Sequence, residues 1–202
     1  MKRLIILLLP VLLIVGCSSK EPINRDLMLI ERDRLYYTKD TNKPYSGRVF
    51  TLYDNGENKL ECGYKDGELD GLYTLWNKNG QKRKESNYKD GKLNGLVTEW
   101  YKNGEKEETT YKDDERHGTN TAWYKNGQKR KESNYKDGKL NGLIRFWYEN
   151  GQKREEGTYK DGESHHELFT VWYENGQKKI EGTFKDGDWI SKKEWNEDGS
   201  PR

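Results

Sequence analysis

Apolar and polar residues along this chain follow a pattern of short segments that end in turn signals. Residues 71–76 are rich in aromatic and β-favouring types and lead to the turn Asn79-Gly80. Residues 81–89 carry mostly charged side chains and lead to a second turn at residues 90–91. Asn-Gly and Asp-Gly tolerate the positive φ values that a two-residue hairpin loop requires. The unit therefore predicts two antiparallel strands.

This unit recurs along most of the chain. Asn-Gly or Asp-Gly turns have their glycines at Gly56, Gly80, Gly104, Gly127, Gly151, Gly176 and Gly199. The intervals are 24, 24, 23, 24, 25 and 23 residues, so about six copies fill residues 34–202. A repeat of this size gains stability mainly by stacking on its neighbours. We expect an all-β fold, an elongated antiparallel β-meander of stacked hairpins that is largely single-layered.

The turn position also predicts a register. An ideal two-residue loop at Asn79-Gly80 places Trp76 opposite Arg83, where a cation against an exposed indole contributes about 0.5–1 kcal/mol. The same register pairs Trp123 with Arg130, Trp147 with Arg154, Trp172 with Lys179, Trp195 with Arg202 and Trp100 with Glu107. It further predicts a cross-strand ion pair between Lys82 and Glu99. The tryptophans should then form a row along the sheet.

The first residues predict a targeting signal rather than a part of the fold. Residues 1–16 combine a basic head with an apolar run over 4–15, which is the order of a secretory signal. The run is shorter than the ~20 residues that span a bilayer. We expect a signal helix over 1–16 and a polar tether over 17–33.

The segment Ile14-Val15-Gly16-Cys17 resembles the lipobox of bacterial lipoproteins. The resemblance implies cleavage before Cys17, attachment of acyl chains such as palmitate to that residue, and a membrane anchor in the cell envelope, outside the cytoplasm. Several acyl chains anchor stably. Ser18 after the cysteine implies the outer membrane if the source has one. The alternative is an ordinary signal peptide followed by an incidental cysteine.

Charge and composition exclude some partners. Of 37 basic residues two lie in the first sixteen, which leaves 35 against 35 acidic residues. A formally neutral chain does not predict a nucleic-acid-binding face. A charged fraction of 36% could indicate disorder. Tryptophan and tyrosine keep the phase of the repeat, however, which favours a folded array.

Cys62 is the only other cysteine, so no intrachain disulfide is available once Cys17 is acylated. It stands two residues before the repeat tyrosine, where every copy has a small residue. The aligned residues are Ser86, Thr109, Ser133, Gly157 and Gly182. We therefore interpret Cys62 as a packing residue rather than a reactive thiol.

Two hairpins break the pattern. Asp114 replaces a turn glycine, with Arg116 and His117 where other copies have Leu-Asn, and His165-His166 follow with one extra residue. We expect an altered turn or a β-bulge at these places. A metal site at the two histidines is disfavoured, because neighbours on a strand point to opposite faces.

No catalytic residues, metal or cofactor are expected, and the chain is not predicted to be an enzyme. No nucleophile has a plausible histidine partner. The carboxylates recur in phase, five residues after the turn glycine, which indicates a solvated ladder rather than an acid and base pair. These residues are Glu61, Glu85, Glu132, Glu156 and Glu181.

Residues 156–162, with sequence Glu-Gly-Thr-Tyr-Lys-Asp-Gly, and Trp172-Tyr173-Glu174-Asn175-Gly176 resemble the MORN repeat, and more closely its bacterial variant. The resemblance covers residues 34–200. It implies a ladder of hairpins that acts as an interaction scaffold. Many bacterial chains of this type are described as YwqK-family antitoxins, which implies a neutralising protein partner.

Two functions remain open from the sequence. The first is a membrane-anchored scaffold or immunity-like inhibitor that binds a protein on a face or an edge of the sheet. The second is binding of glycan or cell wall by exposed aromatic rings, which is favoured if the indole faces are open and disfavoured if Arg and Lys cover them. The candidate surface comprises Trp76, Trp100, Trp123, Trp147, Trp172, Tyr101, Tyr124, Tyr148 and Tyr173.

Overall fold

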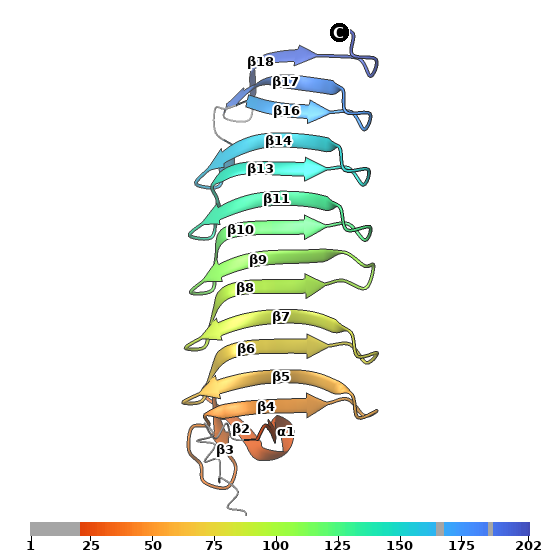
Figure 1. Cartoon of the computed structure of the whole chain (residues 1–202). Coiled ribbons are helices and arrows are strands. Elements are labelled where there is room, and N and C mark those ends of the chain that lie inside the picture. The colour runs from red at the N-terminus through yellow and green to blue at the C-terminus, as the bar shows by residue number, and fades with distance from the viewer. Residues whose placement is uncertain (1–20, 165–167, 186–187) are drawn as a thin grey trace, which may run out of the picture.

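The computed structural model describes residues 21–164, 168–185 and 188–202. Over these residues the chain forms one long sheet in which strands follow one another in chain order (Figure 1). Neighbouring strands are antiparallel, except that β1 runs parallel to β4. The predicted all-β meander of stacked hairpins is confirmed. The predicted signal helix over 1–16 lies outside the described residues.

The sheet is built from strands of two to nine residues. Its strands are β1 (Ile23–Asn24), β4 (Gly47–Leu52), β5 (Asn58–Lys65), β6 (Glu68–Trp76), β7 (Lys82–Lys89), β8 (Lys92–Trp100), β9 (Lys106–Lys112), β10 (Glu115–Trp123), β11 (Lys129–Lys136), β12 (Lys139–Leu140), β13 (Gly142–Trp147), β14 (Lys153–Lys160), β15 (Glu163–Ser164), β16 (Leu168–Trp172), β17 (Lys178–Lys185) and β18 (Asp188–Glu194). Helix α1 (Arg25–Met28) precedes a separate hairpin of β2 (Leu29–Arg32) and β3 (Leu35–Thr38).

The Asp-Gly turns form one edge of the sheet. At residues 90–91 both φ angles are positive, 47° and 76°, as a two-residue type I′ loop requires. The Asp113-Asp114 turn keeps the same shape, with φ of 50° and 71°. Its second carboxylate accepts a hydrogen bond from the Leu93 N–H at 2.7 Å, which helps to offset the cost of a left-handed aspartate. Of the two predicted irregularities, an altered turn is therefore wrong, whereas a β-bulge is present in this hairpin.

The strand after each Asp-Gly turn carries a bulge. The register of β10 with β9 shifts between Arg116 and Asn120, and the register of β7 with β8 shifts between Ser86 and Tyr88. The bulge near His117 is thus a property of the repeat rather than of one irregular hairpin. The predicted irregularity at His165-His166 lies outside the described residues.

The Asn-Gly turns have a different loop from the predicted one. The Asn77 N–H donates to the Gln81 carbonyl at 2.8 Å, and the Gly80 N–H donates to the Asn77 carbonyl at 3.0 Å. This is a three-residue loop that ends on a left-handed glycine, since φ of Gly80 is 78°. Trp76 consequently lies opposite Lys82, and the predicted pair with Arg83 is wrong.

The same correction applies along the array. The observed pairs are Trp100 with Lys106, Trp123 with Lys129, Trp147 with Lys153, Trp172 with Lys178, and Trp195 with Pro201. In β6–β7 the register shifts next to Trp76, so Leu75 faces Lys84 and Arg83 is the extra residue of a bulge. Hairpin β8–β9 shows no such shift, because the interval from Gly104 to Gly127 is one residue shorter.

One face of the sheet, here called the tyrosine face, carries Tyr64, Tyr88, Tyr111, Tyr135 and Tyr159. Its central row alternates larger and smaller side chains across the strands. The row runs through Val49, Cys62, Tyr73, Ser86, Val97, Thr109, Asn120, Ser133, Ile144, Gly157, Phe169 and Gly182. The small positions are buried, which confirms the predicted packing role of Cys62.

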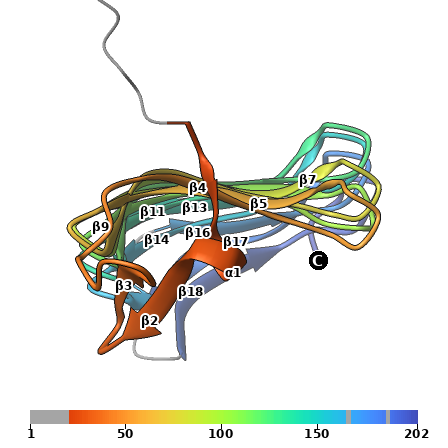
Figure 2. The ribbon, with the colours of Figure 1, turned by 90° about the horizontal axis from the view of Figure 1, so that it is seen from below.

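A hydrophobic core forms only at the N-terminal end of the described sheet. Leu29 and Tyr45 pack there with Cys62 and with residues of β4 and β5. Figure 2 shows α1, β2 and β3 at one face of the first strands. The predicted tether over 17–33 is therefore wrong in its described part, because Leu29 is apolar and has a sheet face to cover. The rest of the sheet is single-layered, as predicted.

Candidate interaction site at the Asn-Gly edge

The loops that contain the Asn-Gly turns and Asp198-Gly199 line one edge of the sheet, on the right of Figure 1, which we call the Asn-Gly edge. In every loop the first residue donates its N–H to the carbonyl of the fifth. The loops span residues 53–57, 77–81, 101–105, 124–128, 148–152, 173–177 and 196–200. This shared geometry places equivalent side chains of successive repeats side by side.

The candidate tryptophans lie half-buried just inside this edge. A lysine of the preceding hairpin covers the indoles of Trp123, Trp147 and Trp172, and that of Trp195 further along the edge. The ammonium-to-centroid distances are 4.0 Å for Lys106 over Trp123, 5.9 Å for Lys129 over Trp147, 5.3 Å for Lys153 over Trp172 and 5.9 Å for Lys178 over Trp195. The predicted contact between a cation and an indole is present, but the cation comes from the neighbouring repeat rather than from the same hairpin.

The tyrosines that follow these tryptophans connect successive repeats. The Tyr124 hydroxyl donates to the Trp147 carbonyl at 2.7 Å, and Tyr53 donates in the same way to Trp76 at 2.7 Å. Tyr148 and Tyr173 donate to the carbonyls of Trp172 and Trp195 at 2.9 and 3.0 Å. We call this hydrogen bond the tyrosine clamp. Three of the candidate tyrosines therefore hold the array together.

The tyrosine clamp is missing in the middle of the described edge. Asn77 stands where the other loops, except the last, have tyrosine, so no ring extends from this loop towards Trp100. In the next loop the Tyr101 hydroxyl donates to the carboxylates of Glu107 and Glu99, at 3.2 and 3.3 Å. Partial burial and these two carboxylates raise the pKa of Tyr101 to about 12. Its phenol therefore stays protonated and engaged within its own hairpin.

An open cavity of about 1050 Å³ lies where the first clamp is missing. Its aromatic wall is formed by Tyr53, Trp100 and Tyr101, and its cations are Lys78, Lys82, Arg83 and Lys102. Its volume is in the range of ligand pockets, although it is open rather than enclosed. Asn77 lines it at the place that a tyrosine ring would occupy.

The structure brings only two of the candidate residues, Trp100 and Tyr101, into this cavity. Trp76 lines a smaller cavity of about 520 Å³ on the other side of its hairpin. Sequence reasoning missed Asn77 and the surrounding cations. The signal was available, because Trp76-Asn77 interrupts a Trp-Tyr pair that the next four loops keep.

The in-phase carboxylates lie on the face opposite the tyrosine face, here called the glutamate face and defined by Glu61, Glu85, Glu132, Glu156 and Glu181. Lysines of the same strands bind several of them, as in Lys82–Glu85 at 2.6 Å and Lys153–Glu156 at 2.9 Å. The predicted Lys82–Glu99 pair is wrong, because Lys84 binds Glu99 at 3.0 Å. The bulge at Arg83 places Lys82 beside Glu85 instead.

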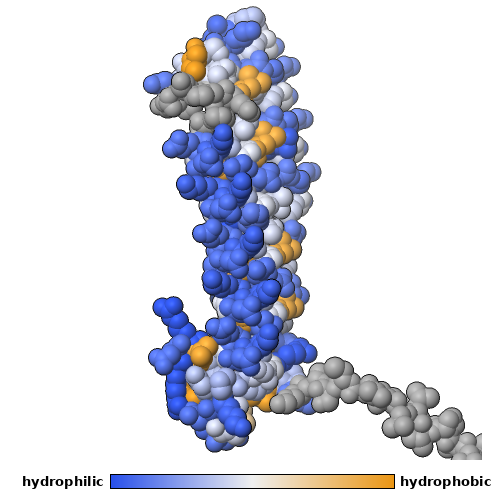
Figure 3. All heavy atoms as spheres, turned by 90° about the vertical axis from the view of Figure 1, so that its left-hand side faces the viewer, coloured by the Kyte–Doolittle hydropathy of each residue, from blue (hydrophilic) through white to orange (hydrophobic). Residues whose placement is uncertain are grey.

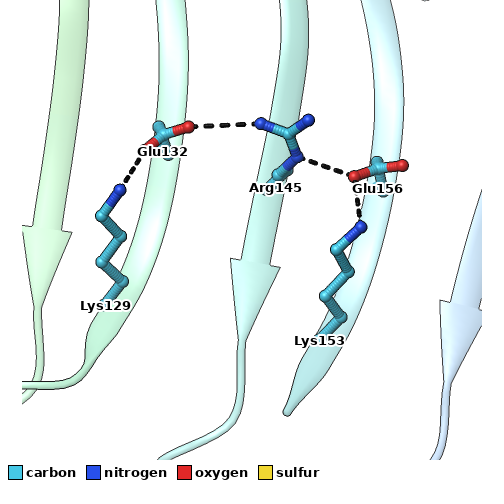
Figure 4. A network of polar contacts seen from close by, with 5 residues as sticks. All are labelled: Lys129, Glu132, Arg145, Lys153 and Glu156. Atoms are coloured by element: carbon cyan, nitrogen blue, oxygen red, sulfur yellow. Dashed lines mark hydrogen bonds and ion pairs between the residues drawn. The ribbon is translucent and has the colours of Figure 1, made fainter. Parts of the chain in front are cut away.

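Arg145 links two of these pairs into a network (Figure 4). Its guanidinium lies 3.3 Å from Glu132 and 2.7 Å from Glu156. Hydrogen bonds from Lys129 and Arg145 hold the pKa of Glu132 below its usual value. Partial burial opposes the shift at Glu156, but Lys153 and Arg145 outweigh it and lower that pKa as well.

The opposite edge, formed by the Asp-Gly turns, faces the viewer in Figure 3. Its surface is mostly hydrophilic, with small apolar patches along one side. Lysines flank its turns, and these side chains are exposed. This edge serves as a chemically distinct comparison for the Asn-Gly edge.

Within the described residues, no three His, Cys, Asp or Glu side chains are grouped to hold a metal ion. Nor does any described helix have the length and apolar character needed to cross a bilayer.

Comparison with protein families gives a match to the MORN repeat variant. The matched residues are 69–90, 93–113, 116–137, 140–161 and 168–186. No curated protein matches the chain. The matched segments make up more than half of the sequence, and the first four begin in the strand that directly follows a two-residue turn. The chain therefore belongs to the MORN repeat variant family.

Proposed function

We propose that this protein is an interaction scaffold that binds a protein partner along its Asn-Gly edge. The observation that supports this proposal is the cavity at Asn77, where an otherwise regular array opens next to aromatic and cationic side chains. Departures from a local rule often mark functional positions. The repeats on either side provide a rigid support, since each is bonded to its neighbour.

The proposal includes a lipid anchor in the cell envelope, outside the cytoplasm. It rests on the residues up to Cys17, whose order of charge, apolar run and cysteine is typical of lipoproteins. Replacing Cys17 by Ser should release the protein from membranes and abolish acyl labelling. Cys62→Ser is the matched control and should leave the protein on the membrane. Unchanged acyl labelling of Cys17→Ser would contradict the anchor.

We propose no catalytic step. The carboxylates of the glutamate face are held by lysines or arginines, an arrangement that suits a structural ladder better than acid and base catalysis. A neutralising role towards a secreted or surface toxin is the finer form of the proposal. It follows from the antitoxin-like resemblance together with the extracytoplasmic address.

Glycan or cell-wall binding is the second candidate. Lysines cover the indoles of Trp123, Trp147 and Trp172, which disfavours sugar stacking there. Trp100 is different, since it lines the cavity and no cation lies over its ring within the described residues. The glycan hypothesis therefore predicts a sugar ring stacked on Trp100 in this cavity.

One experiment distinguishes the two candidates. The anchored protein is crosslinked in its native host, and whatever copurifies is identified, with cell-wall glycan included in the screen. We expect a single protein in stoichiometric amount. Retention on glycan without a protein partner would contradict the scaffold proposal and favour the second candidate.

A further inference from the structure

After the first loop, whose tip is Asp54, the charges at the loop tips divide the Asn-Gly edge into two blocks. The second residue of the loop is lysine in three successive loops and glutamate in the next two and the last. These tips are Lys78, Lys102 and Lys125, followed by Glu149, Glu174 and Glu197. All six side chains are exposed. Two of the three basic tips, Lys78 and Lys102, belong to the loops that lack the tyrosine clamp, whereas Lys125 belongs to the clamped loop of Tyr124.

The cations of the cavity are not neutralised equally. Lys82 forms an ion pair with Glu85 at 2.6 Å, and the one carboxylate in the lining, Glu105, lies 3.9 Å from Arg130. Within the described residues, Lys78, Arg83 and Lys102 form no salt bridge. Lys78 instead lies 5.7 Å from the centre of the Tyr53 ring. The cavity thus offers three uncompensated positive charges beside an aromatic wall.

The spacing of the tips sets the geometry of an occupant. Successive loops are two strands apart, and strands in a sheet lie 4.7–4.9 Å apart, so the tip lysines repeat every ~10 Å. A peptide in the extended polyproline II conformation has three residues per turn and rises 3.1 Å per residue, so every third side chain points to the same side at intervals of ~9 Å. A chain in this conformation along the edge can therefore present a carboxylate to each lysine if every third residue is acidic.

We propose that the basic block and its cavity bind an extended peptide segment with acidic residues at every third position. Lys78, Lys102 and Lys125 take the carboxylates, and Tyr53 and Trp100 contact the side chains between them. This inference rests on the proposed function, since it names the class of segment that a protein partner supplies. The Glu149 to Glu197 block repels the same segment, which limits binding to one half of the edge.

The test uses the purified full chain and a dye-labelled peptide of three Glu-Ala-Ala units, read by fluorescence anisotropy. A peptide of the same composition with its three glutamates adjacent is the control probe. We expect the spaced peptide to bind more tightly and to weaken as salt rises. Equal affinity for the two peptides would overturn the proposed spacing.

Charge variants locate the site. Lys78→Glu with Lys102→Glu should weaken binding of the spaced peptide by roughly tenfold or more, which corresponds to losing two charge contacts and adding repulsion. The matched control is Lys136→Glu with Lys160→Glu, which makes the same charge change among exposed lysines of the Asp-Gly edge. An equal loss in the control variant would overturn the site, because it would show that net charge alone drives binding.

Two further outcomes separate this inference from the proposed function. If the protein partner crosslinks equally well to the Lys78→Glu, Lys102→Glu variant, the scaffold stands and the basic block is not its site. If neither a protein nor the peptide binds, both proposals fail. Tighter binding of an oligosaccharide rich in carboxylates than of the spaced peptide would also overturn the peptide assignment.

Discussion

The two halves of the Asn-Gly edge are built from the same repeat and differ in how closely the repeats are joined. From Tyr124 onwards each loop donates a tyrosine hydroxyl and a turn-asparagine amide to the next repeat, as in Asn126 to the Glu149 carbonyl at 2.8 Å. In the half around Asn77 the tyrosine is absent, and at Tyr101 it is engaged elsewhere. The half from Tyr124 onwards is clamped, with acidic tips after Lys125, whereas the half around Asn77 and Tyr101 is open and basic.

This difference shows how a regular array can acquire a site. Stability in a repeat protein is close to a sum over neighbouring interfaces, so one interface can lose a contact without unfolding the others. The loss at Asn77 leaves space for a ligand, while both flanking regions keep their bonds. The predictions below test whether the missing clamp is the cause of the difference.

Closing the cavity should have the largest effect. Asn77→Tyr restores the ring that the later loops possess, and we expect it to fill the cavity and weaken the spaced acidic peptide by about tenfold or more. Anisotropy measures the binding, and urea unfolding shows that the variant is folded. Asn77→Ala is the control and should bind as the wild type does. If the Asn77→Tyr protein is folded and binds the peptide with unchanged affinity, the cavity is not part of the binding site.

Removing a clamp should lower stability only where a clamp exists. Tyr148→Phe deletes the hydroxyl that donates to the Trp172 carbonyl, and we expect a loss of about 1 kcal/mol in the free energy of unfolding. Tyr101→Phe should cost less, about 0.5 kcal/mol or below, because its hydroxyl bonds only exposed carboxylates. Urea midpoints followed by tryptophan fluorescence compare the two. Equal losses in the free energy of unfolding would show that the Tyr101 hydroxyl stabilises the array as much as a tyrosine clamp does.

Acid should weaken the Arg145 network in the clamped half. The folded-state pKa values of Glu132 and Glu156 lie below the ordinary 4.5, so their contribution is fully present above pH 4.5 and is lost as pH falls through the lowered values. Arg145→Thr, which copies Thr121 and Thr170 of the same row, should cost less than about 1 kcal/mol at neutral pH. The difference from wild type in melting temperature should vanish in acid. A difference that persists there would exclude the ion pairs as its source.

The smallest expected effect is at Cys62, in the core that covers the first strands. Its side chain is 1% exposed, and burial raises its pKa to about 11. We expect no alkylation by iodoacetamide in the folded protein at about pH 8, where a free thiol reacts readily. Mass spectrometry of the Cys17→Ser variant, with and without urea, measures this. Rapid labelling without urea would show that the N-terminal end opens more easily than its packing indicates.

Several features of this protein follow from local sequence alone. Strand pairs, loop positions and the small residues of the central row are all set by neighbours in the chain, because an Asp-Gly turn needs positive φ and a pleated strand alternates its side chains. The burial of Ser86 and Ser133 could therefore be predicted from their place in the repeat. So could the all-β meander, since no other arrangement stacks identical hairpins in sequence.

Contacts between repeats were decided by the tertiary structure. A loop one residue longer than expected, followed by a bulge at Arg83, changes which cation faces Trp76. Lys106 then covers Trp123 of the next hairpin rather than an indole of its own. The sequence by itself determined the hairpins and their phase, because turn chemistry acts over a few residues. Only the stacked sheet decided the lysine cover, the tyrosine clamps and the cavity at Asn77, because these depend on how one repeat lies against the next.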